Sequence, residues 1–257
     1  MNWRIGSVPH LNARPLIYGI EPQVTLLTPA RLADAMHRRE FDVGLVPVAE
    51  VLRHDQYDIV DGIAVASFGP VRSVFLVHRN PVEQIRNVYV DPASRSSVWL
   101  LRVLLAKRFG IEPEFHARAT DGEATLVFGD NAINRIARHP EESRLDLGAA
   151  WTEWTGLPFV YAVWAAQREA QREAKREEGS RKSELLKRLK EAKVAGLARI
   201  EEVVAKSTEG TPEIRREYLT KHIRYDLGEA EKNGLRKFQE CLQSMNLVKS
   251  HELRFVG

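Results

Sequence analysis

Strand-like and helix-like segments alternate through residues 3–151 of this chain. The segment 41–46 (FDVGLV) is apolar at nearly every position, as expected for a strand covered on both faces. Such alternation favours parallel strands with helices packed against the sheet, an α/β fold. We expect strands at 3–8, 24–27, 41–46, 73–77, 87–90, 114–116, 125–128 and 145–151, and helices at 12–20, 28–39, 96–109 and 131–138.

A short internal similarity indicates two units of similar design. Asp42-Val43-Gly44 and Asp146-Leu147-Gly148 each begin an apolar run that closes a strand–helix set. A three-residue match also arises by chance, so both interpretations stay open. The last third is predicted to be helical and to pack on the first unit. Within it, 167–178 (QREAQREAKREE) has four basic and four acidic residues, which predicts a solvated helix with charge pairs four residues apart.

Composition excludes several classes of protein. With one cysteine, Cys241, the chain has no internal disulfide and no cysteine-rich zinc site. The net charge of +3, from 38 basic and 35 acidic residues, is too even for a nucleic-acid protein and mildly favours an anionic small molecule. No apolar run approaches a membrane span, and no secretory signal is evident. We therefore expect a cytoplasmic protein with neither nucleic acid nor membrane as partner; the oligomeric state is left open.

Familiar catalytic motifs are absent from the sequence. There is no glycine-rich dinucleotide or P-loop signature, no H-E-x-x-H zinc motif and no G-x-S-x-G nucleophile motif. The eight histidines are scattered, and a lone histidine is more often structural than catalytic.

Polar residues collect where predicted strands end, which is where open α/β sheets bind ligands. Ser94-Arg95-Ser96-Ser97 begins a predicted helix, where free amides, hydroxyls and a guanidinium suit a carboxylate; a plain serine N-cap explains it equally well. Asn12 either closes a turn or orients a ligand. The candidates at strand ends are 7–12, Pro47, Ser73, 94–97, 129–131 (including Asp130, an ordinary helix cap, and Asn131) and 151–153.

Five aromatic residues lie within 151–164, and we expect most of them in the core and one or two beside a cleft. Trp151 is the candidate for a ligand contact. The five are Trp151, Trp154, Phe159, Tyr161 and Trp164.

The segment 4–16 (RIGSVPHLNARPL) resembles the opening of the chorismate dehydratases of the futalosine route to menaquinone. Similar motifs follow in order across nearly the whole chain, although His10 stands where that family often has tyrosine and 167–178 departs from its pattern. The matching segments are 46–50 (VPVAE), 69–74 (GPVRSV), Asp91 with 94–97, 147–148 with 151–152 and 155–160, 218–219, 223–225, and Gly234-Leu235-x-x-Phe238.

The resemblance implies a type II periplasmic-binding-protein-like fold, with two α/β lobes around a hinge and a helical C-terminal tail packed on lobe one. Lobe one would comprise 1–75 plus 165–257, and lobe two 76–164. The implied activity is that of a hydro-lyase, which dehydrates chorismate to 3-[(1-carboxyvinyl)oxy]benzoate without a metal or cofactor.

The same resemblance leads to a hypothesis about roles. Ser96 and Ser97, with the helix amides, would hold one carboxylate, and Ser73 with Val74 the other. Asn12 would bond near the reacting carbon or the departing hydroxyl, and a substrate carboxylate would take the ring proton. Pro47, Arg95, Asp130, Asn131 and Trp151 are the remaining predicted substrate contacts.

Other functions remain open at this point. A non-catalytic cytoplasmic binding protein for an aromatic carboxylate would use the same helix starts. The sister enzyme of the pathway, which forms a dihydroxynaphthoate, has a different opening motif from Asn12-x-x-Pro15-Leu16. A nucleic-acid protein is suggested only by the pI of about 9.0.

Overall fold

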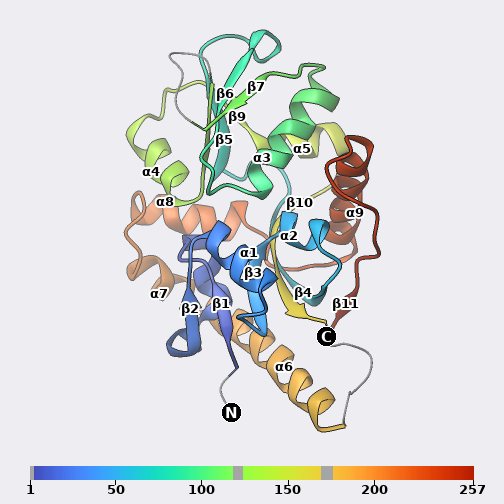
Figure 1. Cartoon of the computed structure of the whole chain (residues 1–257). Coiled ribbons are helices and arrows are strands. Elements are labelled where there is room, and N and C mark those ends of the chain that lie inside the picture. Colours follow the sequence, from blue (N-terminus) through green and yellow to red (C-terminus); the bar gives the residue numbers. More distant parts are fainter. Residues whose placement is uncertain (1–2, 118–123, 169–175) are drawn as a thin grey trace.

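The computed structural model describes residues 3–117, 124–168 and 176–257, with side chains except for 176–182. Its strands form two sheets, which occupy the lower and upper parts of the molecule in Figure 1. The six-stranded sheet has the order β11-β4-β10-β3-β1-β2 and the five-stranded sheet β7-β6-β8-β5-β9. The first comprises β1 (Ile5–Ser7), β2 (Val24–Leu26), β3 (Val43–Pro47), β4 (Tyr57–Ser67), β10 (Phe159–Gln167) and β11 (Phe255–Val256). The second comprises β5 (Val74–His78), β6 (Asn87–Tyr89), β7 (Glu114–His116), β8 (Ala124–Phe128) and β9 (Arg144–Asp146).

Both sheets are mixed. The predicted parallel pairing holds for β1 with β2 and β3, and for β6 with β7 and β8. In contrast, β10 runs antiparallel to β3 and β4, and β5 runs antiparallel to β8 and β9. The antiparallel strands β4, β5 and β10 adjoin the segments where the chain passes between the sheets. The predicted two-lobed α/β fold is thus confirmed, with mixed rather than purely parallel sheets.

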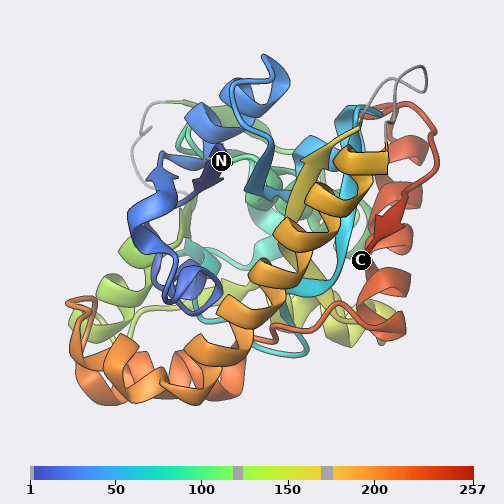
Figure 2. The ribbon, with the colours of Figure 1, turned by 90° about the horizontal axis from the view of Figure 1, so that it is seen from below.

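Helices cover the sheets, and the C-terminal third is mostly helical, as predicted. Figure 2, viewed from below, shows α6 lying across the lower end of the molecule, where it contacts η1 and β4. The helix α9 packs on β10 and also touches α3 of the other part. The α-helices are α1 (Pro29–His37), α2 (Val48–Arg53), α3 (Ser96–Val103), α4 (Asp130–Arg138), α5 (Leu147–Thr155), α6 (Arg176–Ala198), α7 (Ile200–Ala205), α8 (Pro212–Glu217) and α9 (Glu229–Ser244). The 3₁₀-helices are η1 (Leu11–Ile17), η2 (Glu21–Gln23) and η3 (Val82–Gln84), and the π-helices are η4 (Leu104–Arg108) and η5 (Tyr218–His222).

The strand predicted at 145–151 is wrong. Strand β9 ends at Asp146, whose carboxylate accepts hydrogen bonds from the amides of Gly148 (2.9 Å) and Ala149 (3.0 Å) and so begins helix α5. The same carboxylate binds the amides of Val71 (3.0 Å) and Arg72 (2.7 Å). Asp42 instead lies before strand β3 and pairs with Arg4, so the Asp-x-Gly similarity marks different structures.

Other predicted elements differ in extent. The helix expected at 12–20 is the 3₁₀ turn η1, which contains Pro15 and therefore lacks one backbone donor. Most of the charged repeat 167–178 lies outside the described residues; Gln167 ends strand β10, and α6 begins at Arg176. Within the described residues, no helix is long and apolar enough to cross a membrane.

The division into lobes remains a proposal. Strand β10 belongs to the sheet of β1–β4, and β5 to the other sheet. We therefore propose that the chain crosses between the lobes at 68–73 and 156–158. The sequence-based boundaries after residues 75 and 164 instead fall within β5 and β10.

Candidate active site

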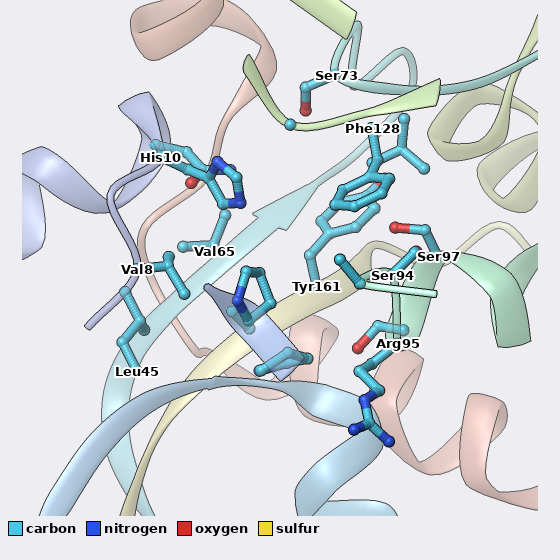
Figure 3. Close-up of a pocket in the computed structure, with 18 residues that line it drawn as sticks. Val8, His10, Leu45, Val65, Ser73, Ser94, Arg95, Ser97, Phe128 and Tyr161 are labelled. Atoms are coloured by element: carbon cyan, nitrogen blue, oxygen red, sulfur yellow. The ribbon is translucent and has the colours of Figure 1, made fainter. Parts of the chain in front are cut away.

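A cleft of about 610 Å³, part of it open to solvent, lies between the two sheets (Figure 3). One wall comes from the segment after β1 together with β3, β4 and β10. The other comes from the start of β5, the segment 93–97 at the start of α3, and Phe128 with Gly129 after β8. Ligand-facing residues of both walls thus come from strand ends and helix starts, as expected for open α/β sheets.

Seven of the ten predicted site residues line this cleft: Asn12, Pro47, Ser73, Val74, Arg95, Ser96 and Ser97. Three do not. Asp130 lies behind the lining, where Oδ1 accepts a hydrogen bond from the Leu11 amide at 3.0 Å. Asn131 is exposed and faces a separate hollow with Asn134 and Arg138.

Trp151 is fully buried, so the prediction that it contacts a ligand does not fit its position. Its indole packs edge-on against Trp154, Phe159 and Phe238, and its Nε1 donates to the Pro158 carbonyl at 3.1 Å. The cluster of aromatic residues is therefore mainly core, and only Tyr161 among the five reaches the cleft.

A hydrogen-bond chain joins Asn12 to Ser73 through Tyr218. The Asn12 amide Nδ2 donates to the Tyr218 hydroxyl at 3.0 Å, and that hydroxyl donates to Ser73 Oγ at 2.9 Å. Burial raises the pKa of Tyr218, so its hydroxyl stays protonated and keeps this direction of donation. One hydrogen of the Asn12 amide and the proton of Ser73 are left for a ligand. Sequence reasoning singled out Asn12 and Ser73 but not the tyrosine that connects them.

The helix α3 starts at the cleft and presents Ser97, whose hydroxyl is directed toward the same space as Tyr161 and Phe128 (Figure 3). Ser96 Oγ accepts a hydrogen bond from the Ala49 amide at 3.1 Å, so Ser96 also ties the two walls together.

Arg95 turns its guanidinium away from the centre of the cleft and pairs with Asp34 of α1 at 3.0 Å. The expected convergence of Arg95 with the serine hydroxyls is therefore not seen. Helix amides and Ser97, rather than a full cation, are the groups that α3 offers to an anion.

His10, within the candidate range 7–12, and Tyr161, one of the five aromatic residues, line the cleft, although neither was among the ten predicted site residues. The imidazole of His10 projects into the cleft (Figure 3), with Nδ1 3.5 Å from Asp130 Oδ2 and with Nε2 buried and unpartnered among the described residues. Gly129 has a positive φ of 63°, and a Cβ there would lie 3.0 Å from the His10 ring. The Tyr161 hydroxyl lies 3.0 Å from Ser67 Oγ, and burial raises its pKa. Among the described lining residues, none carries a carboxylate side chain.

Four buried tyrosines predict a loss of stability at alkaline pH. Burial is the largest cause that raises the pKa of Tyr57, Tyr161, Tyr218 and Tyr225 in the folded protein. Their contribution to stability is therefore complete below the unfolded value of about 10 and is lost as the pH rises above it. Urea unfolding midpoints should fall steeply above about pH 10. Tyr225→Phe, which removes a buried hydroxyl without a described partner, should reduce that fall, whereas identical curves for the two proteins would contradict this account.

The two sheets and the cleft between them define the class by fold: a two-lobed α/β protein with a periplasmic-binding-protein-like fold. The periplasmic aliphatic sulphonate binding protein of Escherichia coli has a similar structure, with a TM-score of 0.62 at 16% identity, over 99% of this chain and 96% of that one.

Sequence comparison is more specific. The family described as "Menaquinone biosynthesis" matches residues 3–244. A chorismate dehydratase of Thermus thermophilus is 30% identical over 93% of this chain and 94% of its own length. A chorismate dehydratase of Campylobacter jejuni is 26% identical over 86% of this chain and 83% of its own. The chain belongs to the menaquinone biosynthesis family, which confirms the resemblance found in its motifs.

Proposed function

We propose that this chain is a chorismate dehydratase, which converts chorismate to 3-[(1-carboxyvinyl)oxy]benzoate and water. The observation that carries the proposal is the common cleft lined by Asn12, Ser73 and Ser97. Full-length similarity to two chorismate dehydratases supports it. A cytoplasmic location is part of the proposal, and the free, buried Cys241 is compatible with a reducing compartment.

The dehydration depends more on how the substrate is positioned than on a strong acid or base of the protein. The ring carbon that bears the enolpyruvyl ether loses a proton, and its neighbour loses hydroxide; together these leave as water. The ring becomes aromatic, so the reaction is strongly downhill. The protein must hold two carboxylates and stabilise the departing hydroxide.

We assign the two anions to the two ends of the hydroxyl-lined cleft. Ser97 and the amides at the start of α3 would bind one carboxylate. Ser73, whose Oγ accepts from Tyr218, would donate its proton to the other, beside Val74. The free hydrogen of the Asn12 amide would donate to the departing hydroxide.

The ring proton needs an acceptor. Since no side-chain carboxylate is found among the described lining residues, we assign this role to a carboxylate of the substrate itself. His10 stands where the family often has tyrosine, so it is not assigned the role of base.

Removing the hydroxyl of Ser97 should weaken substrate binding. A hydrogen bond to a charged group contributes about 1.5–3 kcal/mol, so Ser97→Ala should raise KM roughly 10- to 100-fold with a smaller effect on kcat. Ser143→Ala, an exposed serine of the same part of the chain, is the matched control. An unchanged KM in Ser97→Ala would remove Ser97 from carboxylate binding.

Tyr218→Phe tests the connection between Asn12 and Ser73. The variant keeps the buried ring but loses both hydrogen bonds, so both partners become free to rotate. We expect kcat to fall about tenfold, the size of one or two lost neutral hydrogen bonds, and the free energy of unfolding to fall by about 1–2 kcal/mol for the same reason. A variant with wild-type kcat would show that the hydroxyl does not position the site.

A further inference from the structure

A second group of chemically active side chains lies outside the proposed site, where the C-terminal end of α1 meets helix α2. His37 is the last residue of α1, Glu50 lies within α2, and His54 follows four residues later as the C-terminal cap of α2. Their ligand atoms all lie within 4.8 Å of one another, and none of the three lines the cleft. The two imidazole rings are 4.3 Å apart, and His54 Nε2 is 3.7 Å from Glu50 Oε1.

The charge balance of this group favours a cation. Glu50 is only 8% exposed, and its carboxylate accepts a hydrogen bond from the Tyr57 hydroxyl at 3.0 Å. A buried carboxylate is costly without a positive partner. The C-terminal ends of both helices add partial negative charge at the same place. Two imidazoles so close together repel each other when both are protonated, whereas in their neutral forms they can share one cation.

The donor set indicates the class of cation. Two imidazoles and one carboxylate are a set that zinc uses when a fourth position is left to water. Ligand atoms around tetrahedral zinc are about 3.3 Å apart for bonds of about 2.0–2.1 Å, so the separations within this group would have to shorten by at most about 1.5 Å. His37 is exposed, which leaves a path for the ion and its water.

The nitrogen donors narrow the choice of metal further. Arg53 and Arg95 act electrostatically on Glu50, and Arg53 and His251 act on His54, so the ion must form strong bonds to stay bound beside these positive groups. Calcium and magnesium prefer oxygen ligands, whereas imidazole suits zinc and related transition metals. We propose that His37, Glu50 and His54 bind one divalent transition-metal ion of the zinc class, which ties the end of α1 to the end of α2.

Such an ion would brace one wall of the cleft without entering it. Helix α2 follows Pro47, which lines the cleft, and its Ala49 amide bonds Ser96 of the opposite wall. These three ligands would bind the ion whatever the cleft contains, so metal binding here is independent of the proposed reaction.

The test uses the untagged full-length protein, stripped with chelator and titrated with cobalt(II), then with zinc(II) in competition. We expect one equivalent of cobalt, the absorption of a tetrahedral site, displacement by zinc, and a rise in unfolding temperature with zinc. His37→Gln changes an exposed side chain and should weaken binding at least tenfold; His54→Gln should do the same.

His139→Gln, an exposed histidine elsewhere, is the matched control and should bind as the wild type does. Wild-type protein that binds no ion would overturn the proposal. So would equal affinity in the His37→Gln, His54→Gln and His139→Gln proteins, because that result means adventitious binding only. Glu50→Gln, checked for folding by circular dichroism, should also lose the tetrahedral signal.

Discussion

An Asn12→Ala variant should fold normally and lose about 100- to 1,000-fold in kcat, the cost of removing one well-placed donor to developing negative charge. Asn12 lines the cleft, and its amide is held by the Tyr218 hydroxyl at 3.0 Å, so its second hydrogen has a fixed direction. Steady-state kinetics with chorismate measure the effect.

The comparison protein for this variant is Asn80→Ala, which changes an exposed asparagine. Its kcat should equal that of the wild type. If Asn12→Ala also turned over chorismate at the wild-type rate, Asn12 would have no part in the mechanism, and the donor to the leaving hydroxide would have to be sought elsewhere in the lining.

Gly234→Ala should lower the free energy of unfolding by about 3 kcal/mol, near the upper end for an overpacked site. A Cβ at this buried position of α9 would lie 2.0 Å from the Pro158 carbonyl oxygen. That oxygen also accepts the indole hydrogen bond of Trp151. Because the atom met is a backbone oxygen and the indole bonded to it is fully buried, we expect the clash to outweigh the gain in helix propensity of about 1 kcal/mol.

Urea unfolding followed by circular dichroism measures the Gly234→Ala effect. Asn233→Ala, at the exposed neighbouring position of the same helix, should leave stability unchanged or slightly higher. A Gly234→Ala protein as stable as Asn233→Ala would mean that α9 does not pack as closely on the segment before β10 as described.

The hydrophobic pattern of the sequence was sufficient to predict strands β1, β2 and β3 of the six-stranded sheet. The strand expected at 41–46 lies over β3, because a fully apolar run has no stable place except between helical layers. The same reasoning failed at 145–151, where Asp146 caps a helix and an apolar helix looks like a buried strand over a few residues. The long strands β4 and β10 were not predicted, although their pairing with each other and with β3 and β11 builds half of the sheet.

The site was partly predictable for a similar reason. Asn12 and Ser73 stand where strands end, so local sequence marks them as candidates. Tyr218 comes 145 residues after Ser73, and its hydroxyl reaches Ser73 only because the C-terminal part of the chain folds back to the segment before β5. Arg95 was predicted to face the ligand, but its pairing with Asp34 depends on how the two walls meet. Local sequence patterns do not predict contacts between segments that are far apart in the chain.

The most direct test of the central claim is to incubate the purified protein with chorismate alone and to follow its products by absorbance and mass spectrometry. We predict catalytic conversion to 3-[(1-carboxyvinyl)oxy]benzoate, with the loss of one water per chorismate. Chorismate that binds the protein but is recovered unchanged would identify a binding protein of the same fold and would contradict the account.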